Sequence, residues 1–132
     1  MKLRTLFLFN TVVALLFSLG FLILPGIVLR LFGFTNDPGT RLLGRFIGVE
    51  LLVGGLITFF AKDSRDTKSL EAITTANLVA SLVGFVASLA GVVSGTMNLL
   101  GLLIVVTYLL LTLWFGYFQL VGPRKKFLST PF

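Results

Sequence analysis

The chain lacks cysteine and histidine altogether. Without cysteine it forms no disulfide and offers no thiolate to a metal or substrate. Without histidine it lacks the usual imidazole ligand of zinc or haem and the side chain that most often acts as acid or base near neutral pH. Paired carboxylates and a phosphate-binding loop are also missing, because no Lys-Ser/Thr pair follows Gly54-Gly55 at the required spacing. We therefore expect no metal, no cofactor and no catalytic residue, which predicts a protein that is not an enzyme.

Charged residues are scarce as well. They make up 12% of the 132 residues, against about a quarter in a typical soluble domain, while apolar residues make up 56%. A small soluble domain leaves much of its surface in water, so this much apolar surface needs lipid. The net charge of +6 comes from basic residues at the ends of apolar segments, where they suit anionic headgroups. The expected partners are membrane lipids and not nucleic acid.

Four apolar segments are long enough to cross a bilayer, which takes about 20 residues. The sequence predicts one all-α domain over residues 1–132, a bundle of four transmembrane helices at about 5–29, 39–61, 70–93 and 98–121. Pro25 predicts a kink or helix end, and Asp37-Pro38 predicts an N-cap with its first-turn proline. The cluster of small and polar residues at 94–98 divides the last uncharged run into two helices.

The distribution of Lys and Arg predicts the orientation. Eight of them fall on the side that holds both termini and the middle loop, and only three, Arg30, Arg41 and Arg45, fall on the other. The side richer in basic residues is usually cytoplasmic, so both termini are expected inside. The residues expected to anchor the chain at the two membrane surfaces are Arg45, Trp114, Tyr117, Arg124, Lys125 and Lys126.

Small residues recur at three- and four-residue spacing on two of the predicted helices. Such rows allow helices to approach closely in lipid, where packing drives their association. They are Gly44, Gly48 and Gly55 on the second helix, and Ala80, Gly84, Ala87, Gly91 and Gly95 on the third. Two interpretations remain open for the row on the third helix: it is the inner face of the bundle, or it is a dimerisation seam.

Glu50 falls at the centre of the second predicted helix, near the bilayer midplane. An ionised carboxylate costs on the order of 3 kcal/mol there, and such residues often have a function. Either it is a neutral structural acid bonded to a neighbour, or it is a proton or cation site. Tyr108, with Thr112 one turn away, is at a similar depth and is the expected neighbour. Asn10 and Asn77 are each expected to bond a neighbouring helix.

A further pattern runs through the first half of the chain: Pro25, Leu29, Phe32-Gly33, Arg45-x-x-Gly48, Leu51 and Gly54. It resembles an uncharacterised bacterial family of small four-helix integral membrane proteins. The second half resembles that family only in general hydropathy. The resemblance implies four helices and the bacterial cytoplasmic (inner) membrane, and it implies no activity.

Two functions from different classes remain open. The first is a non-enzymatic accessory or structural membrane protein, which assembles with itself as a homo-oligomer or with a larger membrane complex. The second is a small transporter or lipophilic-ligand binder that uses Glu50 as a proton or cation site. Polar residues gathered around Glu50 would favour the second function.

The predicted topology can be tested with single cysteines, since the native chain has none. Cysteines introduced at Ser64 and at Thr96 should react with an impermeant maleimide from opposite sides of the membrane, because one helix separates the two loops. Reaction of both cysteines from the same side would contradict a four-span chain.

Overall fold

The computed structural model describes residues 2–121, and all regular structure in this part of the chain is helical. Its elements are α1 (Leu3–Ile23), α2 (Pro25–Leu31), α3 (Pro38–Ala61), α4 (Thr67–Val93), α5 (Gly101–Gly116) and a short π-helix, η1 (Tyr117–Val121). Helices α1, α3, α4 and the continuous segment Gly101–Leu120 are long and apolar enough to cross a membrane. The prediction of an all-α fold with four candidate spans is confirmed for residues 2–121.

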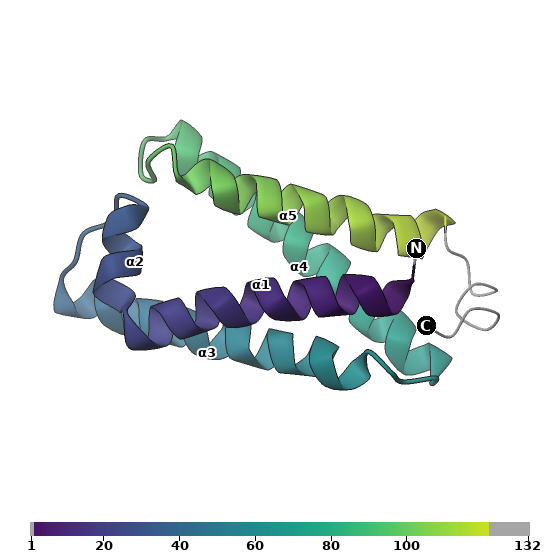
Figure 1. Cartoon of the computed structure of the whole chain (residues 1–132). Coiled ribbons are helices and arrows are strands. Elements are labelled where there is room, and N and C mark those ends of the chain that lie inside the picture. The colour runs from purple at the N-terminus through teal and green to yellow at the C-terminus, as the bar shows by residue number, and fades with distance from the viewer. Residues whose placement is uncertain (1, 122–132) are drawn as a thin grey trace.

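The four long helices form two pairs (Figure 1). Helix α1 lies along α3, and α4 lies along α5, each pair antiparallel. The pairs meet mainly at the end of the molecule that holds the N-terminus, where the first turns of α1 reach the end of α5. The arrangement is therefore two helical hairpins joined over part of their length.

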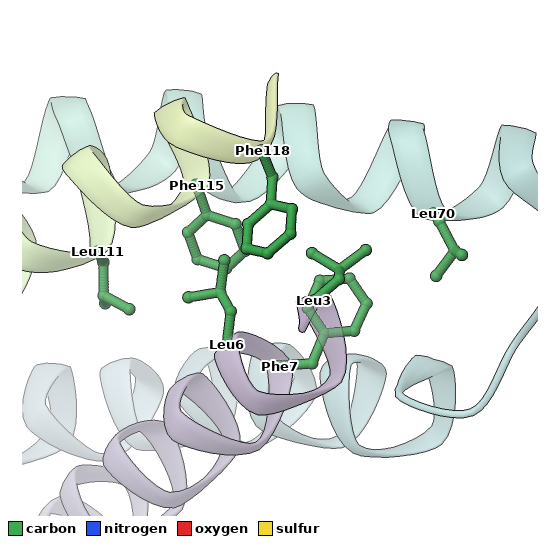
Figure 2. Packing of buried hydrophobic residues seen from close by; sticks show 7 residues of the cluster. All are labelled: Leu3, Leu6, Phe7, Leu70, Leu111, Phe115 and Phe118. Atoms are coloured by element: carbon green, nitrogen blue, oxygen red, sulfur yellow. The ribbon is translucent and has the colours of Figure 1, made fainter. Parts of the chain in front are cut away.

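Large apolar side chains hold the hairpins together at that end (Figure 2). The buried cluster comprises Leu3, Leu6, Phe7, Leu70, Leu111, Phe115 and Phe118. Its residues come from α1, α4, α5 and η1, so both hairpins contribute to it. The rings of Phe7 and Phe115 lie 6.4 Å apart between centroids, and both residues are fully buried. Aromatic side chains of this size dominate the packing energy of a core.

The first predicted helix, 5–29, is corrected by a break before Pro25. Helix α1 ends at Ile23, and Leu24 leaves the helical region with φ −126° and ψ 51°. A residue before proline is pushed out of the α conformation, whereas proline itself fits the first position of a new helix. Helix α2 therefore starts at Pro25 and turns away from the line of α1 (Figure 1).

A polar contact joins the two hairpins at the opposite end. The backbone N–H of Asn98 donates to the Phe32 carbonyl at 3.0 Å, and Asn98 Nδ2 donates to the Leu31 carbonyl at 2.7 Å. Gly33 makes this approach possible, because its φ of +85° suits glycine and its missing side chain leaves room for Asn98. The end of α2 is thus tied to the turn between α4 and α5.

The predicted cap of α3 is confirmed. Asp37 Oδ1 accepts from the Thr40 N–H at 2.9 Å, and Pro38 occupies the first turn. Hydrogen bonds from the backbone and side chain of Thr40 and from the Thr35 hydroxyl lower the pKa of Asp37 to about 2.

The last two long helices do not begin where the sequence predicts. Their predicted first residues, 70 and 98, are corrected to Thr67 and Gly101. Asn98 belongs to the turn instead of the helix, because its side chain accepts from the Leu100 N–H.

The buried cluster predicts a difference between two leucines of α5. Leu111 is 5% exposed and Leu113 is 63% exposed. Leu111→Ala should lower the free energy of unfolding by about 2 kcal/mol, the low end of the usual range, because lipid already solvates part of what is removed. Leu113→Ala, the matched control, should have little effect. Thermal unfolding in one detergent measures both, and equal losses would contradict the packing.

Candidate functional site

The contact between α1 and α3 contains a buried polar cluster of Asn10, Thr11 and Thr58. Asn10 Nδ2 donates to Thr58 Oγ1 at 3.3 Å, and the two threonine hydroxyls lie 2.8 Å apart. Both hydroxyls also lie 3.1 Å from the Gly55 carbonyl. The hydroxyl protons therefore have acceptors without help from water. Such bonds between helices are well suited to a membrane interior, where an unpaired polar group is costly.

Further along the same contact, glycines bring the two backbones together. Ser18 Oγ donates to the Gly48 carbonyl at 2.7 Å. A Cβ at Gly48 would lie 2.8 Å from Leu22 Cγ and 3.1 Å from the Ser18 carbonyl oxygen, and one at Gly55 would lie 3.1 Å from Leu15 Cδ2. The predicted packing residue Gly44 faces the same side, with Phe21 3.3 Å from its added Cβ. Gly44, Gly48 and Gly55 of α3 thus lie against α1.

Glu50 lies elsewhere. It is exposed at the centre of α3, on the surface turned away from the other helices of residues 2–121, and Arg45 is exposed on the same helix. Neither side chain makes a hydrogen bond or ion pair with any residue between 2 and 121. Gly54, one turn beyond Glu50, has open space where a side chain would be. The structure therefore leaves the predicted site residue Glu50 without its expected neighbour.

Tyr108 and Thr112 belong to the other hairpin. The Tyr108 ring covers Gly84 of α4, where an added Cβ would lie 2.5 Å from Tyr108 Cε1. Thr112 Oγ1 donates to the Tyr108 carbonyl of its own helix at 2.7 Å. Tyr108 thus packs against α4, Thr112 bonds its own helix, and neither is joined to Glu50 by a hydrogen bond.

Only some of the predicted small packing residues of the third helix make contacts within residues 2–121. Gly84 lies against Tyr108, and Gly91 lies against Met97. Ala80 and Ala87 are exposed. The prediction that they pack against another helix of the same chain is therefore wrong for the described residues. Gly95 lies beyond the helix in the turn with φ +80°, and nothing approaches its open side. Helix α4 buries Thr74, Ser81 and Ser88 along with Leu70, so its inner face mixes small polar residues with glycine.

Of the predicted anchors, Trp114 packs against Phe9, with ring centroids 5.5 Å apart. Its indole N–H is buried and, like the Thr74 hydroxyl, has no hydrogen-bond partner among the described residues. Tyr117 is exposed at the start of η1. Arg124, Lys125 and Lys126 lie outside the described residues.

Asn77 does not bond a neighbouring helix as expected, because its Nδ2 donates to the Ile73 carbonyl one turn earlier.

Charges gather at the end of the molecule that holds the N-terminus. Arg4 Nε lies 2.8 Å from Asp63 Oδ1, and Lys62 Nζ lies 3.1 Å from Asp63 Oδ2. The hydrogen bonds from Arg4 and then from Lys62 hold the pKa of Asp63 below its ordinary value. Lys62 also lies over the Phe59 ring, 4.2 Å from its centroid. The contact joins the start of α1 to the loop after α3.

Within residues 2–121, no three His, Cys, Asp or Glu side chains come close enough to hold a metal ion. No family model, curated protein or solved structure matches the chain. The family resemblance described above stays a prediction.

The sequence prediction missed Thr11 and Thr58 as partners of Asn10. A usable signal was present, since Thr58 lies three residues after Gly55 and so shares a face with the glycines of α3. Ser18 lies eight residues after Asn10, about two turns along α1. On α1 and α3, the face that carries both small and hydroxyl residues is the face that is buried.

The polar cluster predicts that Thr58→Val weakens the protein. The change keeps the shape of the side chain but removes the group that both Asn10 and Thr11 bond. We expect a loss of about 1 kcal/mol in the free energy of unfolding, the size of an interhelical hydrogen bond in a membrane. Thr107→Val is the matched control, since Thr107 bonds only the Leu103 carbonyl of its own helix. Equal stability of the two variants would show that the cluster contributes nothing.

Proposed function

We propose that this chain is a non-enzymatic integral membrane protein, an accessory or structural subunit that assembles within the bilayer with itself or with a larger membrane complex. The proposed setting is a bacterial cytoplasmic membrane with both termini on the cytoplasmic side. The prevalence of Lys and Arg in the segments on that side supports the orientation.

One observation carries the proposal: the outward surface of α3. This helix buries Gly44, Gly48, Gly55 and Thr58 against α1, while Arg45 and Glu50 point out among exposed apolar residues. A charged side chain near the middle of a span normally faces protein or a water-filled cavity, since exposure to hydrocarbon costs on the order of 3 kcal/mol. None of the helices between residues 2 and 121 covers this face. A protein partner in the membrane would cover it.

The alternative, a transporter or lipophilic-ligand binder built around Glu50, has less support. It calls for polar residues gathered near the carboxyl, yet Tyr108 and Thr112 lie in the other hairpin. The groove beside the second half of α3 is lined almost wholly by apolar side chains, among them Val53, Ile57 and Phe60. A surface of this kind suits contact with another apolar helix.

Site-specific photocrosslinking tests the proposed role. A benzophenone amino acid replaces Val53 on the outward face of α3, or Val83 on the outward face of α4 as a control. Irradiation of intact membranes should give a protein adduct from position 53, because a partner covers that face. Position 83 should react with lipid. Lipid adducts alone at both positions would contradict assembly through α3.

A further inference from the structure

Six of the ten large apolar residues that are exposed on α3 follow a heptad pattern. Counting along the helix, large side chains alternate at intervals of four and three residues, the spacing of the a and d positions of a coiled coil. They are Leu42, Phe46, Val49, Val53, Leu56 and Phe60, and every one is exposed. The buried residues Gly48, Gly55 and Thr58 fall at the c and f positions of the same heptads, on the opposite side. Helix α3 thus has one face for α1 and a second, unoccupied seam.

The two charged residues flank this seam. In the same heptads Arg45 takes position g, just before Phe46, and Glu50 takes position e, just after Val49. The two residues are about 140° apart around the helix, so they lie on opposite edges of the seam and cannot pair within one chain. Residues at e and g are the ones that form salt bridges between the helices of a coiled coil.

The geometry points to a second copy of this chain packed in parallel along α3, with Arg45 of each copy paired to Glu50 of the other. In a parallel pair, a g residue faces the e residue that lies five positions later on the partner. Arg45 and Glu50 are five apart. The axial offset is about 7.5 Å at 1.5 Å per residue.

A second copy fits this face better than an unrelated helix does. The face carries its own complementary charges at the required spacing, and a two-fold axis normal to the membrane forms both ion pairs at once. Two copies inserted with the same topology can only present α3 in parallel, and a parallel pair is what the five-residue spacing needs. Each pair also neutralises a carboxylate that would otherwise face hydrocarbon. This inference rests on the proposed assembly through α3 and names its partner.

Single cysteines test the register. Phe46, Val49 and Val53 are seam positions, whereas Ile47 lies at position b and is exposed to a similar degree, 48% against 58% for Phe46. Under mild oxidation in membranes, cysteines at 46, 49 and 53 should form disulfide-linked dimers, and a cysteine at 47 should not. Equal crosslinking at 46 and 47, or none at the three seam positions, would overturn the parallel seam.

Charge exchange tests the ion pairs. Arg45→Glu and Glu50→Arg should each weaken the dimer in nanodiscs, by roughly tenfold or more in the dissociation constant. The double exchange should restore it, because each copy then offers the same pair in reverse. The neutral variants Arg45→Gln and Glu50→Gln serve if a reversed charge prevents insertion, and each should weaken the dimer less than tenfold but measurably. Wild-type dimerisation of all single variants would refute the pairing.

The photocrosslink at position 53 separates this inference from the proposed function. An adduct of twice the 14.4 kDa chain mass supports the second copy. An adduct of another mass would refute the homodimer while leaving assembly through α3 intact. The absence of any protein adduct would refute both.

Discussion

The close approach of α1 and α3 is the constraint on which the rest of the structure depends. Lipid offers no hydrophobic drive to pair two apolar helices, so contact must come from packing and from bonds between polar groups. Glycines at 44, 48 and 55 let the backbones meet, and the hydroxyls of Thr11 and Ser18 then reach carbonyls on α3. Any larger residue at Gly48 would press against the Ser18 carbonyl. The same glycine therefore allows the close approach of the two helices and the hydrogen bond from Ser18.

Once α1 and α3 are paired, the remaining positions follow. The proline after Leu24 turns α2 across the end of this hairpin, which carries Phe32 and Gly33 to the α4–α5 turn. There Asn98 ties the second hairpin to the first. At the other end the contact is apolar and aromatic, formed around Phe7 and Phe115. Hydrogen bonds therefore join the two hairpins at one end, and packing of apolar side chains joins them at the other.

The same pairing explains why Glu50 faces outward. A helix that turns its glycines toward one neighbour must turn the residues on the other side away from it. Glu50 and Arg45 fall outside the buried arc, at the two edges of the apolar face opposite the glycines. The functional proposal follows from this division of α3 into an inner and an outer face. The inner face is complete within the chain, and the outer one would be completed by a partner.

The sequence alone determined the helical class, the number of long apolar helices, the cap at Asp37 and the break near Pro25, because each depends on local chemistry or on length. Its small-residue rows also marked Gly48, Gly55 and Gly84 as contact residues. Only the tertiary structure decided which helices pair and which way each face turns. Ala80 shares a row with Gly84 yet is exposed, and Glu50 and Tyr108 share a depth yet lie in different hairpins. Periodicity shows which residues share a face of one helix, but only the packing of a second helix decides which face is buried.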